Sequence, residues 1–380
     1  MTQRFTLVAL ALALVALRGD ARAQAPPATP RRPASASAPA GAPVGASAVE
    51  QRLLAAVRRT PDDFAARHAL GEFYLQAGKV TAAIPHLERA RALDPSHYPN
   101  GYDLALAYLE TGALDAARQQ VQGMLAAKET GDLFHLQGDI AARAGDYAGA
   151  AVGYQRAAHL EPTEPHLFDW GNNLLQLRAY DDAADVFTAS LRRHPRSPRL
   201  HVGLGIAQYS RGRHEDAVTS FCEAADLDPS DPRAVTFLGE MYGVVPSRSE
   251  DITRRLARFV SLKPRDANGH YYYAMSLWRG PANGATADLA KVEALLRRAV
   301  VLDRSHAKAR LQLGILLSEQ KRWREAIVPL QAAATLEPRL AQAHFRLAQA
   351  YRRTGQTQRA DRSLATFEAL QEKDASSPVP

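Results

Sequence analysis

One dense group of polar side chains in this sequence could do chemistry, the trio His214-Glu215-Asp216. An imidazole beside two carboxylates offers the donor types that bind a transition metal. However, the trio stands where the surrounding pattern predicts the start of a helix, and carboxylates in a first turn interact favourably with the helix dipole. We therefore interpret the trio as a helix start, with a metal site as the weaker alternative.

Other catalytic signatures are absent from the sequence. It contains no His-Glu-x-x-His, no phosphate-binding loop, no Gly-x-Ser-x-Gly and no Cys-x-x-Cys, and its twelve histidines are dispersed. The single cysteine, Cys222, rules out an internal disulfide, and we expect it to be a small buried side chain and not a nucleophile. The prediction is a protein that is not an enzyme and that uses no cofactor and no metal.

The elements that must position all these side chains are copies of one helical pair, clearest in residues 64–95. Two helices of about a dozen residues are predicted, at about 64–76 and 81–92, ended by Gly78 and by Pro95. Their small and apolar residues fall on single helical faces: Leu70, Gly71, Tyr74 and Leu75, then Ala83, Leu87 and Ala90. Isolated helices of this length are marginal in water, so neighbouring units must stack.

The small residue of the first helix recurs at intervals of 33 to 35 residues, with one interval of 40: Gly71, Ala105, Gly138, Gly171, Gly205, Gly239, Ala274, Gly314 and Ala348. This period, with Gly71, Tyr74, Ala83, Leu87 and Pro95 at their offsets, resembles the tetratricopeptide repeat (TPR), a helix-turn-helix unit of 34 residues. The resemblance implies an all-α, right-handed superhelical solenoid of about nine repeats.

In that family the first helices line a concave groove in which ligands lie. Mapped onto this sequence, the groove row includes His68, Glu72, Leu106, Leu109, Asp139, Leu175, Val202, Ile206, Leu311, Ile315 and Gln349. The candidate partner-binding residues of the row are Tyr102, His135, Phe168, Asn172, Tyr209, Tyr271, Met275, Trp278 and Phe345. The row is more apolar and aromatic than a solvent-facing surface requires, which favours a binding surface. The alternative is that tight coiling buries part of the row between adjacent first helices.

One ligand class of the family is disfavoured. Some relatives hold a peptide's C-terminal carboxylate with a clamp of lysine, arginine and asparagine on consecutive first helices. Asn172 stands at a clamp-like position, but Phe168 replaces the expected lysine, and the next unit offers only Val202 and Ile206. We therefore do not expect a receptor for chaperone tails.

Composition is that of an ordinary soluble protein. The chain has 380 residues, 46% hydrophobic and 23% charged, with a formal net charge of +7. Such a charge permits contact with an anionic partner, but the arginines are scattered through the units and not gathered in blocks. We interpret them as a solvated surface and expect no nucleic-acid partner.

Residues 1–23 have the pattern of a secretory signal: Arg4, an apolar run over 5–17, and Ala21-Arg22-Ala23 as the cleavage site. Cleavage after Ala25 is the alternative site. An uncleaved anchor is also possible, but 13 helical residues reach only about 20 Å against a hydrocarbon core of about 30 Å. The sequence thus predicts export across an inner membrane to the periplasm, with no transmembrane segment in the mature chain.

The rest of the chain divides by composition. We predict a disordered Pro/Ala-rich linker at 24–48, an N-terminal capping helix at 49–61, the repeat solenoid at 62–370 and a disordered tail at 371–380. The seventh unit carries an insertion at 279–288, which either contacts a partner or is a tolerated surface loop.

Together these observations predict a non-enzymatic TPR scaffold in the cell envelope. Its expected partner is another protein or an extended peptide held in the groove. The alternative is a glycan- or cell-wall-binding envelope protein, in which aromatic side chains stack on sugars and the arginines contact an anionic polymer.

Overall fold

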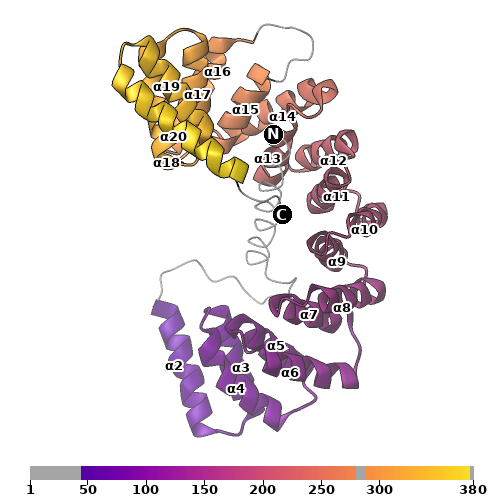
Figure 1. Cartoon of the computed structure of the whole chain (residues 1–380). Helices are drawn as coiled ribbons and strands as arrows, with labels where there is room; N and C mark the ends of the chain where they lie inside the picture. Colours follow the sequence, from indigo (N-terminus) through magenta and orange to yellow (C-terminus); the bar gives the residue numbers. More distant parts are fainter. Residues whose placement is uncertain (1–43, 280–286, 377–380) are drawn as a thin grey trace. The chain divides into compact units, whose positions relative to one another are not determined.

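The computed structural model describes residues 44–279 and 287–376, and over these residues the chain is entirely helical, with 19 α-helices and one short 3-10 helix and no strand (Figure 1). This confirms the predicted all-α fold class. The predicted signal, most of the predicted linker and residues 280–286 of the insertion lie outside the described residues.

The helices fall into two compact units, which divide between Pro195 and Arg196. Unit 1 contains α2 (Val44–Arg59), α3 (Phe64–Gln76), α4 (Val80–Leu93), α5 (Tyr98–Thr111), α6 (Leu114–Ala127), α7 (Gly131–Arg143), α8 (Tyr147–Leu160), α9 (Glu164–Gln176) and α10 (Tyr180–Arg193). Unit 2 contains α11 (Pro198–Ser210), α12 (His214–Leu227), α13 (Pro232–Met241), η2 (Pro246–Arg248), α14 (Ser249–Leu262), α15 (Ala267–Arg279), α16 (Leu289–Leu302), α17 (Ala307–Glu319), α18 (Trp323–Leu336), α19 (Ala341–Arg353) and α20 (Thr357–Ser376).

Each repeat is a helical pair held together by close approach at the recurring small residue. In α11 the backbone of Gly205 lies so near the ring of Phe221 on α12 that an added Cβ would stand 2.5 Å from it. Gly71 faces Leu87 and Gly138 faces Tyr154 in the same way. The glycines recur because the second helix places a large side chain directly on the backbone of the first.

The close contact at Gly205 leads us to predict how a substitution there changes the stability of the protein. Gly205→Ala should lower the free energy of unfolding by about 1–3 kcal/mol, because the methyl group overpacks the contact with Phe221. The matched control is Gly123→Ala on α6, where nothing lies within 4 Å of an added Cβ, and it should raise stability by about 0.5–1 kcal/mol. Urea denaturation measures both; equal shifts in the two variants would contradict the close approach at Gly205.

A recurring side-chain hydrogen bond ties each closing turn to the helix that follows it. In four repeats, a side-chain nitrogen donates to the backbone carbonyl oxygen six residues earlier, over 2.8 to 3.1 Å. The pairs are Arg67 to Pro61, His270 to Pro264, Arg310 to Arg304 and His344 to Pro338. This contact, not predicted from the sequence, gives a partner to a backbone carbonyl of the turn that precedes each of these helices.

Two boundaries differ from the sequence expectations. Helix α2 begins at Val44, five residues before the expected capping helix, and α20 continues to Ser376, through the first residues of the expected loose tail. The polar trio opens α12, with Glu215 and Asp216 in the first turn, and Cys222 is buried, both as predicted.

Candidate functional site

The structure divides the predicted groove residues into buried and accessible ones. Phe168, Tyr271 and Met275 are at most 8% exposed, so the expectation that they contact a partner directly is wrong. The ring of Phe168 lies 6.0 Å from that of Phe187 on α10, and the ring of Tyr271 lies 5.0 Å from that of His306 at the start of α17. Phe168 is covered by the second helix of its own repeat, whereas Tyr271 is covered by the next first helix, as the coiling alternative considered above expects.

Burial extends to further members of the row. Five aliphatic side chains that the register placed in the groove are at most 4% exposed: Leu175, Val202, Ile206, Leu311 and Ile315. All but Leu175 belong to unit 2. The apolar character of the row in that unit therefore reflects packing and not an open binding surface.

The accessible candidates in unit 2 are engaged with neighbours. The guanidinium of Arg279 lies 3.8 Å from the ring of Trp278, and Arg279 also pairs with Glu319 at 2.9 Å. The ring of Phe345 lies 5.2 Å from that of Phe367 on α20. Tyr209, also partly exposed, lies with its ring 5.0 Å from that of His214.

In unit 1 the row stays partly open along successive first helices. We define the inner row as the residues His68 and Glu72 on α3, Tyr102, Leu106 and Leu109 on α5, His135 and Asp139 on α7, and Asn172 on α9. Each of these is exposed or half-buried. The structure thus brings together three of the nine named candidates, Tyr102, His135 and Asn172, on one unit.

His135 is the centre of a network of charged groups. Its Nε2 lies 2.9 Å from Asp169 Oδ2 on α9, and its Nδ1 lies 3.5 Å from Asp139 Oδ2 on α7. The Tyr154 hydroxyl on α8 donates to Asp139 Oδ1 at 2.8 Å. The network therefore connects three consecutive helices, and His135 orients two carboxylates at the inner row.

The protonation of His135 follows from these contacts. Burial lowers its pKa, but the carboxylates of Asp139, Asp169 and Asp132 outweigh burial and raise the pKa to about 9. His135 is consequently an imidazolium at neutral pH. It was predicted to contact a partner, yet the structure gives it carboxylate partners within the protein.

Around this network the surface is acidic and aromatic. The rings of Tyr98 and Tyr102 are stacked with centroids 6.1 Å apart. Burial raises the pKa of Tyr102, and the charges of Asp132 and Asp139 raise it further. Asp103 directly follows Tyr102, and burial raises the pKa of its carboxyl group.

The sequence analysis missed the carboxylates beside the inner row: Asp103, Asp132 and Asp169. A signal was present, because Asp103 and Asp169 each directly follow a residue of the mapped row. Carboxylates next to tyrosine rings form a surface that suits lysine or arginine side chains, through charge-assisted hydrogen bonds and cation–π contacts.

The carboxylate of Asp132 is specific to the third repeat. Asp132 lies six residues before the recurring small residue Gly138, and the other repeats of unit 1 have alanine or proline at that offset. In unit 2 the same offset gives three cations and two uncharged residues: Arg199, Arg233, Lys308, Asn268 and Gln342. Arg233 pairs with Asp231 at 2.8 Å, and Lys308 lies 3.7 Å from Glu240. The acidic group at this place is therefore not a property of the repeat as such.

Two searches of the described residues bear on other functions. No set of histidine, cysteine, aspartate or glutamate side chains in these ranges has the geometry to hold a metal ion. None of the described helices combines the length and apolar character that crossing a membrane requires.

Family comparisons support the repeat assignment. Two tetratricopeptide repeat models match residues 74–140 and 168–232, and a model described as a bacterial transcriptional activator domain matches residues 251–374. Together the three matches include residues from both units.

Curated relatives are similar only over part of their length. The chain is 30% identical over 95 residues to small glutamine-rich tetratricopeptide repeat-containing protein 2 of Mycosarcoma maydis, which covers 25% of this chain and 27% of that protein. It is 24% identical over 170 residues to the human protein O-mannosyl-transferase TMTC1, which covers 42% of this chain and 19% of that protein. The chain thus spans 27% and 19% of the length of these two relatives.

A solved structure shares the fold. The C-terminal part of a TPR repeat-containing protein from Cytophaga hutchinsonii is similar with a TM-score of 0.52 at 16% identity, which covers 64% of this chain and 97% of that one. The period of the glycines, the helical pairs that they hold together and the matching repeat models agree, and the chain is a TPR-type helical repeat protein.

Proposed function

We propose that this protein is a non-enzymatic scaffold and that the inner row of unit 1 binds an extended, basic segment of another protein. The observation that carries the proposal is that the mapped groove stays accessible on successive first helices in unit 1, α3, α5, α7 and α9, and is bordered there by carboxylates. A solvent-facing surface needs no such combination of tyrosine, leucine and aspartate.

The mechanism follows from the contacts already described. Leu106 and Leu109 supply apolar area on α5, and Tyr102 adds a ring with a polar tip. Asp103 and Asp132 favour cationic side chains, while His135 holds Asp139 and Asp169 in fixed positions, which reduces the entropy lost on binding. No single contact is strong, so affinity comes from several repeats acting together.

Charge neutralisation tests the proposal. Glu72→Gln combined with Asp132→Asn should weaken binding of a fluorescent peptide of repeated Lys-Leu-Ser about 3- to 30-fold, since each exposed ion pair contributes about 0.3–1 kcal/mol. Wild-type binding should also weaken as salt is added. Fluorescence anisotropy measures both effects, and circular dichroism checks that the variant is folded.

The control variant changes the net charge by the same amount at positions outside the inner row. Glu223→Gln combined with Glu368→Gln removes two exposed carboxylates on α12 and α20 and should leave the affinity unchanged. A peptide of repeated Glu-Leu-Ser should bind weakly to all forms. If both double variants lost the same affinity for the basic peptide, net charge would explain the effect, and the proposed site at the inner row would be wrong.

We further propose that the scaffold works in the cell envelope, with residues 1–23 removed on export and the residues between Gln24 and the start of α2 at Val44 acting as a tether. The charged start, apolar run and small-x-small site support this location. N-terminal sequencing of the protein from fractionated native cells should give a periplasmic chain that begins at Gln24. A chain that retains residues 1–23 in the cytosolic fraction would refute the location.

The glycan-binding alternative is the weaker candidate. It depended on aromatic side chains open to sugars, but Tyr271 is core and the Trp278 ring is covered by the Arg279 guanidinium. Its test is retention on cell-wall polysaccharide at high salt, where a purely electrostatic contact would be screened.

A further inference from the structure

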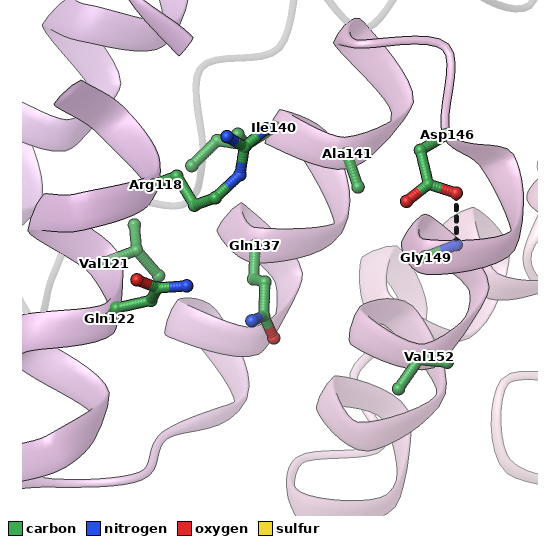
Figure 2. A pocket seen from close by; sticks show the side chains of 9 residues that line it. All are labelled: Arg118, Val121, Gln122, Gln137, Ile140, Ala141, Asp146, Gly149 and Val152. Carbon is green, nitrogen blue, oxygen red and sulfur yellow. Dashed lines mark hydrogen bonds between the residues drawn. The ribbon is translucent and has the colours of Figure 1, made fainter. Parts of the chain in front are cut away.

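A cavity of about 330 Å³ opens in unit 1 between α6, α7 and α8 (Figure 2). Gln137 and Ala141 of α7 line it, and they lie about 200° around that helix from His135 and Asp139 respectively. The cavity is therefore on the opposite side of α7 from the inner row, and the inference does not depend on the proposed function.

The cavity lies where the third repeat lacks the large aromatic side chain that the first two repeats have. Three residues after the recurring small residue stand Tyr74 and Tyr108, and the third repeat has Ala141. Directly before the small residue stand Leu70 and Leu104, which are at most 3% exposed, and the third repeat has the polar Gln137 there. The empty volume therefore corresponds to a tyrosine side chain that the first two repeats supply.

The second repeat shows how a tyrosine hydroxyl is held at this place. The Tyr108 hydroxyl donates to Glu88 Oε1 on the preceding helix, α4, at 2.6 Å. In the first repeat Tyr74 is buried, and burial and the Glu50 carboxylate on α2 raise the pKa of its hydroxyl. In both repeats a carboxylate of the preceding helix therefore acts on the tyrosine.

The matching positions on α6 face the cavity. At equivalent repeat positions, Gln122 corresponds to Glu88 and Arg118 corresponds to Glu50. Gln122 and Arg118 both line the cavity. Figure 2 shows Gln122 reaching in from one helix and Gln137 from the next. Within the described ranges, neither side-chain amide has a hydrogen-bond partner in the protein, so the hydroxyl-binding groups are present while the tyrosine is missing.

We propose that this cavity binds the phenol ring of a tyrosine on a partner polypeptide. The ring lies against Val121, Ile140 and Ala141, and the hydroxyl hydrogen-bonds with the Gln122 amide. A purely aliphatic side chain fits less well, because it would cover the unpaired amides of Gln122 and Gln137 without satisfying them. The volume is at the lower end of the roughly 300–1,000 Å³ usual for ligand sites, which suits one side chain.

The test uses N-acetyltyrosinamide and p-cresol as probes, with toluene as the probe that lacks the hydroxyl. Methyl NMR of the full chain, labelled at isoleucine and valine, should show saturable shifts at Ile140, Val121 and Val152. Ala141→Tyr should abolish these shifts for every probe and raise the melting temperature, because it restores the side chain found in the first two repeats. Gln122→Leu should weaken p-cresol about 2- to 10-fold and leave toluene unchanged.

The controls separate this site from the inner row. Glu72→Gln, at an exposed position of α3, should leave the p-cresol shifts unchanged, whatever it does to the basic peptide. If Ala141→Tyr proves unstable, Ala141→Leu fills the same space with a smaller side chain and should also block the probes.

Three results would overturn the proposal. The first is no saturable shift in wild-type protein. The second is an equal effect of Gln122→Leu on p-cresol and toluene, which would mean a general apolar void. The third is binding of p-cresol but not of N-acetyltyrosinamide, which would mean a site for a free phenol and not for a polypeptide side chain.

Discussion

Tyr271→Ala should lower the free energy of unfolding by about 3–5 kcal/mol, the range for removal of a buried aromatic side chain. Tyr271 is only 8% exposed, and its ring contacts those of Tyr272 and His306 at centroid distances of 5.2 and 5.0 Å. Truncation therefore leaves a cavity between α15 and the start of α17. Urea denaturation of the full chain, followed by circular dichroism, measures the loss.

Two matched variants isolate the cause of this loss. Trp278→Ala, on the same helix, should cost clearly less, because that ring is half-buried and covered on one face by Arg279. Tyr271→Phe should cost less than about 1.5 kcal/mol, since it keeps the ring and removes only the hydroxyl. Equal losses for Tyr271→Ala and Trp278→Ala would show that Tyr271 is not core.

The same argument limits how binding should be tested. Tyr271 was predicted from sequence to contact a partner, but a variant that truncates it would weaken binding by destabilising unit 2. Loss of binding in Tyr271→Ala would therefore say nothing about the groove. Glu72 and Asp132 are better probes because their side chains are solvent-exposed.

The helical pairs could be predicted because their determinants are local. The first helix of the clearest repeat was expected at 64–76 and is α3 (Phe64–Gln76); the second was expected at 81–92 and is α4 (Val80–Leu93). In this repeat Gly78, with a φ of +70°, ends the first helix and Pro95 follows the second, and both act regardless of what packs against the helices. The close contact of Gly71 with the second helix followed from the same pattern.

Burial of the groove row could not be predicted from the same pattern. Whether Tyr271 faces a ligand or His306 depends on how one repeat is rotated against the next, and that angle is set by packing over many residues. Tyr102 and Tyr271 occupy the same register position, yet one is half-buried and the other is core.

The cavity between α6 and α8 could have been found from sequence alone. The exchange of Tyr108 for Ala141, and of Leu104 for Gln137, is visible once the repeats are compared position by position. Period and breaker residues identify the repeat, but they do not show where one copy lacks the volume that the others have. Comparing the repeats at equivalent positions shows which repeat lacks a large side chain, because the repeats share one packing arrangement.

The stability of unit 1 should fall by about 3 kcal/mol as the pH rises from 6.5 to well above 9, because His135 then loses its proton. Its pKa is about 9 in the folded protein against an ordinary value of 6.5, and that difference corresponds to about 3 kcal/mol. Since the folded pKa is the higher one, the stabilisation is complete below pH 6.5 and is lost as pH passes through 9. Asp139 and Asp169 are its direct carboxylate partners.

Urea denaturation at a series of pH values, compared between wild type and His135→Gln, tests this dependence. Glutamine cannot carry a positive charge, so the variant should be less stable than wild type at pH 6.5. Above pH 9 the free energies of unfolding of the two proteins should become similar. His135→Gln also removes the positive charge that lowers the pKa of Asp139 and Asp132, so the difference between the two curves reports on His135 together with these carboxylates. Two parallel curves would mean that the imidazolium does not hold the carboxylates. The inner row would then lack the fixed acidic groups on which binding of a basic segment depends.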